Sequence, residues 1–349
     1  MTDSSGPRLR AGVVGLGMMG RNHVRVWDET VEHVDLVAVA DPDPAAVRRA
    51  TAGRRARGFE DPGRMLAEEQ LDLVSIVAPT RLHRPLAIAA LRAGVHVLVE
   101  KPIAASRDEG IEMMEAANDA GRMLTVGHIE RFNPAIRELR RRLAAGELGR
   151  IFKIHATRLG PFPARIRDVG VVVDLGPHDL DIMCFLADSE PVRIYAEAER
   201  RIHTDHEDLF VGLMKLANGV IGVLDINWLT PTKRRTLTVT GERGMYVADY
   251  IAQDLVFYAN PDAFQTWVNR GTGAPITSVA EGEMTRRVIA RREPLAVELE
   301  EFAAAVRSGG PPPVDPRDAL TALLLARKMV ESAETGSVIA GAELAEALA

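Results

Sequence analysis

Two segments far apart in the sequence carry residues that could do acid/base chemistry. Lys101 follows the apolar run Val95–Val99, which predicts a strand, so we expect the lysine at the edge of a parallel sheet where ligands bind. In the second segment, Asp174 and His178 stand four residues apart. An imidazole beside a carboxylate can act as a general base, and a lysine cation can hold a developing alkoxide. These residue types indicate general acid/base chemistry.

The second segment predicts one charged face if a helix begins near Asp174. Asp174, His178 and Asp181 then lie at i, i+4 and i+7. Pro177 would fall in the first turn, where its missing N–H costs little. A structural interpretation stays open for this segment alone: the aspartate caps the helix, the histidine lies at the surface, and water solvates the face.

A glycine loop near the N-terminus predicts a dinucleotide site. Gly15, Gly17 and Gly20 follow an apolar run, with Met18 and Met19 between the last two, and Asp41 ends a second apolar run 21 residues after Gly20. One glycine permits a tight turn, one lets the backbone approach a pyrophosphate, and one lets helix pack on strand. A carboxylate at Asp41 suits a ribose diol and repels a 2′-phosphate, which favours NAD over NADP. The alternative is an ordinary glycine-rich turn.

Three arginines precede the catalytic segment and could recognise a diphosphate. Arg158, Arg165 and Arg167 fall within ten residues, and two prolines restrict the loop between them. Arginine forks match phosphate oxygens, and a loop ordered before binding lowers the entropic cost. The alternative is that one of them pairs with Asp168 and the others face water.

The elements that must position these residues change type along the chain. The first third alternates short apolar runs with helical patterns, which predicts a parallel, doubly wound sheet. Its expected strands are Leu9–Val14, Val34–Ala40, Leu71–Ala78, Val95–Val99 and Met123–Val126. From Ile151 to Tyr258, strand patterns follow one another with turn signals, which predicts a mainly antiparallel sheet. Two amphipathic helices, containing Leu295–Val306 and Leu320–Met329, close the chain.

Composition and length limit the class of protein. A chain of 349 residues exceeds a usual single core, so we expect two domains, residues 1–128 and 129–349, with closing helices that can return to the first. The net charge of -6 is spread along the chain, which argues against a nucleic-acid partner. The apolar stretches are too short for a membrane span, and Cys184 is the only cysteine. The first apolar run is interrupted by four glycines and lacks a small-residue cleavage site after it, which argues against a signal peptide. These features predict a cytoplasmic protein.

One cluster has metal-ligand types but does not predict a metal. His203, Asp205, His206 and Asp208 lie close in sequence, yet no spaced partner completes a ligand set. We therefore expect no metal.

Together these motifs resemble the Gfo/Idh/MocA family of NAD(P)-dependent sugar and inositol oxidoreductases. The resemblance covers nearly the whole chain and rests on segments in this order: Gly15–Gly20, Ala78-Pro79-Thr80 with His83, Glu100-Lys101-Pro102, Gly127-His128, Asp174 with His178, and Pro313–Leu320. It implies an N-terminal Rossmann domain and a C-terminal α/β domain whose open sheet forms dimers or tetramers. It also implies that Lys101 orients the substrate hydroxyl, that His178 is the acid/base, and that Asp174 partners both. The turns that contain Ala78, Pro79, Thr80, His83, Glu100, Lys101 and Pro102 are expected at the cofactor.

A narrower resemblance concerns the substrate. Residues 127–134, with His128, Arg131 and Asn133, and residues 158–170 look like the family members that oxidise the 3-hydroxyl of UDP-N-acetylglucosamine to a 3-keto sugar nucleotide. The alternatives are an inositol or free-sugar dehydrogenase and a keto-sugar reductase. A further alternative is a regulator that binds NAD without turnover; it is disfavoured because the acid/base set is present.

Overall fold

The computed structural model describes residues 7–163, 169–202, 205–261 and 282–348. The chain divides into two compact units. Unit 1 comprises Met1–Phe132 and Arg292–Leu323, and unit 2 comprises Asn133–Arg291 and Leu324–Ala349. The segment Arg292–Leu323 contains the closing helix α9 (Pro294–Ser308). This helix therefore belongs to the same unit as the N-terminal part of the chain.

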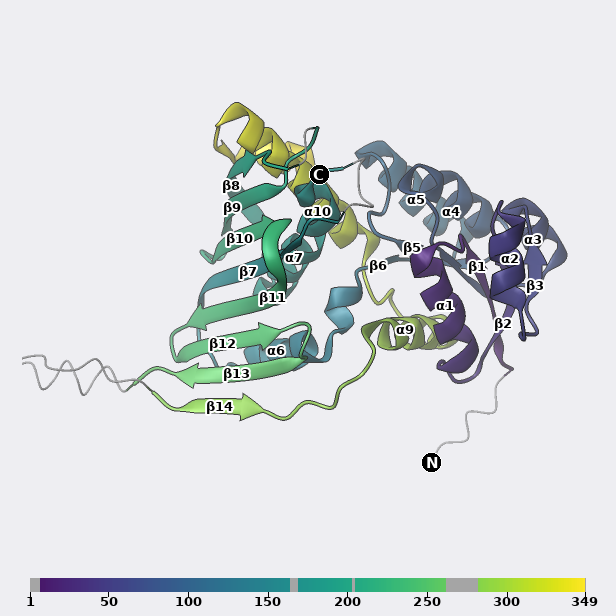
Figure 1. Cartoon of the computed structure of the whole chain (residues 1–349), viewed down its shortest axis with the longest axis horizontal. Coiled ribbons are helices and arrows are strands. Elements are labelled where there is room, and N and C mark those ends of the chain that lie inside the picture. The colour runs from purple at the N-terminus through teal and green to yellow at the C-terminus, as the bar shows by residue number, and fades with distance from the viewer. Residues whose placement is uncertain (1–6, 164–168, 203–204, 262–281, 349) are drawn as a thin grey trace, which may run out of the picture. The chain divides into compact units, whose positions relative to one another are not determined.

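Unit 1 is built on a six-stranded parallel sheet with the order β3-β2-β1-β4-β5-β6 (Figure 1). This is the strand order of dinucleotide-binding sheets, so the expected doubly wound fold is confirmed. The strands are β1 (Leu9–Val14), β2 (Val34–Ala40), β3 (Arg57–Phe59), β4 (Leu73–Ile76), β5 (His96–Glu100) and β6 (Leu124–Gly127). The helices are α1 (Met18–Glu29), α2 (Pro44–Thr51), α3 (Pro62–Glu68), α4 (His83–Arg92) and α5 (Arg107–Ala120), with short 3₁₀ turns η1 (Thr80–Leu82) and η2 (Ile129–Phe132).

Local signals explain where the helices of unit 1 begin and end. Asp43, Asp61 and Ser106 accept hydrogen bonds from the first-turn N–H groups of α2, α3 and α5. Gly121 ends α5 in the left-handed conformation that glycine adopts without strain. Helix α9 joins the core through Phe302, which contacts Trp27 of α1 at a ring-centroid distance of 6.5 Å.

Unit 2 is built on a nine-stranded sheet with the order β14-β13-β12-β11-β7-β10-β9-β8-β15. Among its described strands, β7 and β10 pair in parallel and the other neighbours pair antiparallel, as expected for the second half. The strands are β7 (Ile151–Pro161), β8 (Pro191–Glu199), β9 (Leu209–Leu216), β10 (Ile221–Asn227), β11 (Leu229–Gly241), β12 (Gly244–Asp249), β13 (Asp254–Ala259), β14 (Met284–Arg287) and β15 (Ile339–Ala340).

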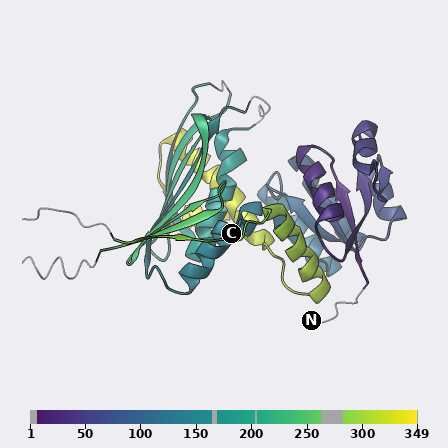
Figure 2. The same cartoon turned by 60° about the horizontal axis from the view of Figure 1, so that its bottom comes forward.

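The helices of unit 2 cover one face of this sheet. They are α6 (Pro134–Ala144), α7 (Val171–Ala187), α10 (Pro316–Thr335, of which the part up to Leu323 belongs to unit 1) and α11 (Ala342–Leu348). In Figure 2 the teal helices lie against one side of the green strands. The core on that side joins residues such as Ile136, Leu180 and Met329 to the inward side chains Phe210 and Leu224. Alternation along the strands therefore decides which face of the sheet is buried.

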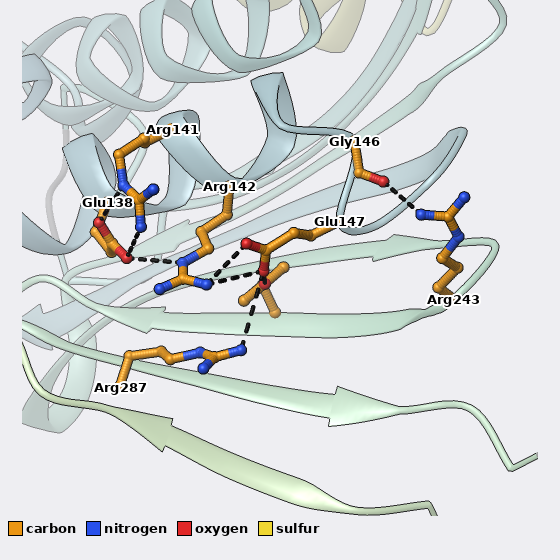
Figure 3. A network of polar contacts seen from close by, with 8 residues as sticks. Glu138, Arg141, Arg142, Gly146, Glu147, Arg243 and Arg287 are labelled. Carbon is orange, nitrogen blue, oxygen red and sulfur yellow. Dashed lines mark hydrogen bonds and ion pairs between the residues drawn. The ribbon is translucent and has the colours of Figure 1, made fainter.

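A polar network fixes α6 to the sheet (Figure 3). Arg142 contacts both Glu138 and Glu147 at 2.7 Å, and Tyr246 of β12 donates its hydroxyl hydrogen to Glu147, also at 2.7 Å. Hydrogen bonding with Arg141 is the largest influence on Glu138 and helps lower the pKa of that carboxyl to about 2. Burial, followed by the contact with Glu147, raises the pKa of Tyr246 to about 12. The network thus stays charged around a neutral phenol at neutral pH.

Candidate active site

The candidate cofactor residues of unit 1 follow strands whose carboxyl ends share one edge of the sheet. The glycine loop follows β1, Asp41 follows β2, Ala78 follows β4, Lys101 follows β5, and His128 follows β6. Because these strands are parallel neighbours, the five turns lie on the same side of unit 1. Strand β1 has β2 on one side and β4 on the other, which marks the point where the strand order reverses and where such sheets bind ligands.

The three loop glycines have the three different surroundings that a dinucleotide site needs. A Cβ at Gly15, where φ is +90°, would lie 2.4 Å from the Val77 oxygen, and one at Gly20 would lie 1.9 Å from the Gly15 oxygen. Gly17, at the start of α1, has no described atom within 4 Å of a Cβ position. Gly15 and Gly20 therefore permit the turn and close packing, while Gly17 leaves room beside the helix N-terminus for a pyrophosphate. Met18 and Met19, the first residues of α1, complete the loop.

Asp41 connects the glycine loop to the end of β2. Its Oδ2 accepts a hydrogen bond from the Leu16 backbone N–H at 2.7 Å, and its Oδ1 accepts one from Asp43 N–H at 2.9 Å. Each carboxylate oxygen retains a second lone pair, so the group can still accept hydrogen bonds from a ribose diol. The residues present therefore fit an NAD cofactor.

His83 fixes the turns that follow β4 and β5. Its Nδ1 lies 2.9 Å from the Pro102 oxygen and its Nε2 lies 2.8 Å from the Ala78 oxygen. The ring is 1% exposed, so it acts as a buried brace between two backbone segments. Pro79 is exposed and Thr80 half-buried beside it, where they can face a ligand.

Glu100, immediately before Lys101, is held by a histidine that the sequence did not single out. His23 of α1 places Nε2 3.2 Å from Glu100 Oε1, and Glu100 Oε2 accepts the Lys101 backbone N–H at 3.1 Å. Burial alone would raise the pKa of Glu100, but the contact with His23 and the charge of Lys101 lower it overall. The carboxylate is therefore charged and fixes the backbone that carries Lys101, which is half-buried.

Three expected substrate residues are buried within their own units. Arg131 is 8% exposed and contacts Asp318 at 3.0 Å, within unit 1. Asn133 caps α6 through Ala135 N–H and donates to the Tyr250 oxygen, within unit 2. His128 is 2% exposed. The hydrogen bonds of Asn133 explain this residue as a helix cap, a role that its position before Pro134 could have revealed.

Helix α7 carries the second chemical segment. Asp174 and His178 are half-buried on it, and Asp181 is 3% exposed. The helix begins at Val171 with Gly170 as its N-cap, three residues before the expected start. Pro177 therefore lies inside the helix, and the expectation that it falls in the first turn is wrong. The i, i+4, i+7 spacing of the three side chains remains, because the helix continues through Ala187.

The reason for the earlier start is a contact from the segment that precedes β9. Val171 N–H donates to the Glu207 backbone oxygen at 2.9 Å, and Val172 N–H donates to Glu207 Oε1 at 3.2 Å. A Cβ at Gly170 would lie 2.0 Å from that carboxylate. Glu207 thus supplies the cap that Gly170 lacks, and only a glycine leaves room for it.

Arg158 of β7 is buried in unit 2, where it forms an ion pair. Its Nε and Nη2 donate to Asp179 of α7 at 2.7 and 2.9 Å, and the two side chains are 3% and 2% exposed. This bidentate ion pair links the strand to the helix and explains the arginine without a diphosphate. Arg165 and Arg167, the other two expected diphosphate contacts, and Asp168 lie outside the described residues.

Other potential sites are weaker. Within residues 7–163, 169–202, 205–261 and 282–348, no group of three or more His, Cys, Asp or Glu could hold a metal ion. Asp208 instead accepts backbone N–H groups of Arg201 and Ile202, while His203 lies outside the described residues. No described helix has the length and apolar character needed to cross a membrane.

Comparison with known proteins identifies the family. Residues 9–128 match the model of the Gfo/Idh/MocA oxidoreductase family with its NAD-binding Rossmann fold, and residues 136–247 match the C-terminal domain of the same family. The chain belongs to the Gfo/Idh/MocA family. It is therefore an NAD-binding oxidoreductase, as the resemblance of its motifs implied.

Similar proteins include enzymes named for a sugar nucleotide and for inositol. A UDP-N-acetylglucosamine 3-dehydrogenase of Acidithiobacillus ferrooxidans is 32% identical over 93% of this chain and 98% of that protein. The solved structure of such an enzyme, GnnA from the same organism, has a TM-score of 0.83 at 28% identity and covers 94% of this chain and 98% of that chain. Inositol 2-dehydrogenase 4 of Saccharopolyspora erythraea is 36% identical over 53% of this chain and 56% of that protein.

Proposed function

We propose that this protein oxidises the 3-hydroxyl of UDP-N-acetylglucosamine with NAD and forms the 3-keto sugar nucleotide. The observation that carries the proposal is similarity to a UDP-N-acetylglucosamine 3-dehydrogenase along 93% of the chain, including the segments that hold Lys101, Asp174 and His178. The inositol dehydrogenase above is similar over 53% of the chain.

In this proposal, one group of residues binds the cofactor and another transfers the proton. The glycine loop and Asp41 hold the cofactor, which when bound accepts a hydride from the alcohol carbon. Lys101, fixed through Glu100, orients the substrate hydroxyl, and its positive charge stabilises the alkoxide that develops. His178 takes the hydroxyl proton, and Asp174, one turn earlier on α7, supports the protonated imidazole.

The nucleotide part of the substrate requires a separate anion site. Because Arg158 pairs with Asp179, we assign the diphosphate contacts to Arg165 and Arg167. Charge-assisted hydrogen bonds contribute roughly 1.5–3 kcal/mol each. Arg165→Ala and Arg167→Ala should therefore raise KM for the sugar nucleotide about 10-fold to 100-fold and leave kcat largely unchanged. An unchanged KM in both variants would show that neither arginine contacts the diphosphate.

A substrate panel tests the proposal. NADH formation is followed by absorbance with UDP-N-acetylglucosamine, free N-acetylglucosamine and myo-inositol, with Lys101→Ala as the inactive control. We expect the largest kcat/KM for the sugar nucleotide. Equal values for UDP-N-acetylglucosamine and the free sugar would mean that the nucleotide is not recognised. A larger value for myo-inositol would favour the second candidate function, an inositol dehydrogenase, which is motivated by the 36% identity noted above.

We also propose that copies of this chain associate as a homodimer or homotetramer through the open face of the nine-stranded sheet. Val211 and Leu213 of β9 and Ile221 of β10 are 43%, 47% and 44% exposed. The strand register places them on one face, opposite the buried core. Contiguous exposed apolar side chains mark interaction surfaces. Leu213→Asp should lower the mass measured by light scattering, and an unchanged mass would exclude this face.

A further inference from the structure

Glu298 of α9 is a buried carboxyl group that the proposed reaction does not use. It is 1% exposed, and neither of its carboxyl oxygens has a hydrogen-bond partner among the described residues. It lies within the apolar stripe of the helix, between Leu295 and Phe302, where the spacing calls for an apolar side chain. A buried polar group without a partner is uncommon in native structures and calls for a functional explanation.

The surroundings of Glu298 connect α9 to the Lys101 turn. Leu295 and Leu299 of α9 share one apolar cluster with Val24 of α1 and Leu98 of β5. Helix α9 also packs against η2, which follows Gly127, and a Cβ at Gly127 would lie 3.0 Å from the Glu100 side chain. The elements packed around Glu298 are therefore those that hold Glu100.

The titratable groups on these elements mostly have partners other than Glu298. Helix α1 carries Arg21, His23, Arg25, Asp28 and Glu29. His23 contacts Glu100, Arg25 pairs with Glu293 at the surface, and Asp28 and Glu29 both pair with Arg54. Strand β5 carries His96 at its start and Glu100 at its end, and Lys101 follows it. The 3₁₀ turn η2 contributes Glu130 and Arg131, and the latter is paired with Asp318. Of all these groups, Glu100 is the one whose charge acts on Glu298.

Two carboxyl groups in one buried region do not readily share two negative charges. Glu100 keeps its charge because His23 and the Lys101 backbone N–H both contact it. Glu298 has no cationic partner among the described residues. Burial and, secondly, the charge of Glu100 raise the pKa of Glu298 well above its ordinary value. At neutral pH the proton of the pair therefore resides on Glu298.

We propose that Glu298 is a positioning residue for cofactor binding: as a neutral acid it leaves one negative charge at Glu100, which holds the Lys101 turn. When Glu298 loses its proton at alkaline pH, a second negative charge enters the buried region around Glu100, behind the turn that carries Lys101. The extra charge repels both Glu100 and the cofactor, so cofactor affinity decreases. The inference concerns NAD binding and does not depend on the sugar proposed above.

Thermal unfolding without cofactor tests the protonation of Glu298. An acid whose pKa is higher in the folded than in the unfolded state stabilises the fold below its unfolded pKa, and this contribution is lost as pH rises toward the folded pKa. Glu298→Gln stays neutral at every pH. We expect Tm of this variant minus Tm of the wild type to increase by about 2–4 °C or more between pH 6 and pH 9. The control Glu300→Gln, on the more exposed side of α9, should show no such trend.

Titration of NADH fluorescence tests the positioning role. We expect the NADH Kd of the wild type to rise between pH 6 and pH 9 by about 5-fold or more beyond the rise in Glu298→Gln. Lys101 and the other groups are common to both proteins, so the ratio of the two Kd values isolates Glu298. If Glu298→Gln does not fold, Glu298→Met gives the same comparison with an apolar side chain of similar length.

Each outcome decides the proposal. A Tm difference that does not change with pH would show that Glu298 is not a neutral acid and would overturn it. A Tm difference that grows with pH, combined with a constant ratio of Kd values, would reduce Glu298 to a buried acid without a role at the cofactor. Growth of both quantities with pH supports the positioning role. None of these measurements uses a sugar substrate, so they are independent of the proposed reaction.

Discussion

The two units hold their candidate functional side chains by different physical means. In unit 1, backbone turns at one sheet edge carry the candidate residues. Asp41 and Glu100 accept hydrogen bonds from the backbone of these turns, and His83 contacts backbone oxygens in them. In unit 2, the helix that carries His178 is held by charged side chains from elsewhere in the chain, Arg158 through Asp179 among them. Backbone turns leave a recognisable local pattern of glycines and prolines. Contacts between side chains that are distant in sequence leave no such pattern. The support of unit 1 can therefore be recognised in the sequence, whereas the support of α7 cannot.

The largest expected effect is on catalysis, through the two residues that we propose for proton transfer and charge stabilisation. His178→Ala and Lys101→Ala should each lower kcat by about 100-fold to 10,000-fold, because general-base removal and loss of charge stabilisation act on the chemical step. NADH affinity measured by fluorescence should stay within about 3-fold of wild type in His178→Ala. Turnover close to wild type in either variant would contradict its assigned role.

The buried ion pair gives the largest expected effect on stability. Arg158→Met leaves the Asp179 carboxylate buried without its partner, which should cost about 3–5 kcal/mol of unfolding free energy in denaturant titrations. The matched double variant Arg158→Met/Asp179→Leu removes both charges and should recover most of that loss. Equal destabilisation of the single and double variants would mean that packing, and not charge, fixes α7 at this point.

The same contrast explains what the sequence could predict. The bounds of β1 and β2 follow from apolar runs, and the structure has them as predicted. The start of α7 was misplaced because its cap, Glu207, comes from 36 residues beyond Val171 and leaves no local signal. Arg158 was assigned to a ligand because sequence spacing cannot reveal Asp179 as its partner. Glu298 had a local signal, a carboxylate within an apolar stripe, that could have been noticed.

The choice between NAD and NADP tests the role of one side chain of unit 1, Asp41. Asp41→Ala removes the acceptor for the ribose diol and the negative charge that repels a 2′-phosphate. We expect NAD to bind about 10-fold more weakly and NADP to approach or exceed NAD in affinity, as measured by dissociation constants. Asp43→Ala, which removes a neighbouring helix cap, serves as the control. A wild-type protein that prefers NADP would contradict the role of Asp41.

The smallest expected effect concerns acid stability and has the opposite sign from that of Glu298. The pKa of Glu138 is lowered to about 2 chiefly by its hydrogen bond with Arg141. The carboxylate therefore stabilises the folded state at pH values above its ordinary pKa. This contribution is lost as pH falls from about 4.5 toward 2. Glu138→Gln should therefore lower Tm slightly at pH 7, as expected for a network that water still reaches, and show a shallower loss of Tm in acid. Parallel acid profiles of the two proteins would mean that the network of Figure 3 is energetically neutral.

Deuterium transfer from labelled substrate tests the central claim most directly. UDP-N-acetylglucosamine carrying deuterium on carbon 3 is incubated with the enzyme and NAD, and the NADH is analysed by mass spectrometry. The account predicts that the NADH carries the deuterium and that turnover under single-turnover conditions is slower than with unlabelled substrate. His178→Ala should transfer deuterium far more slowly. NADH that forms without deuterium, or no NADH at all from this substrate while myo-inositol is oxidised, would contradict the account.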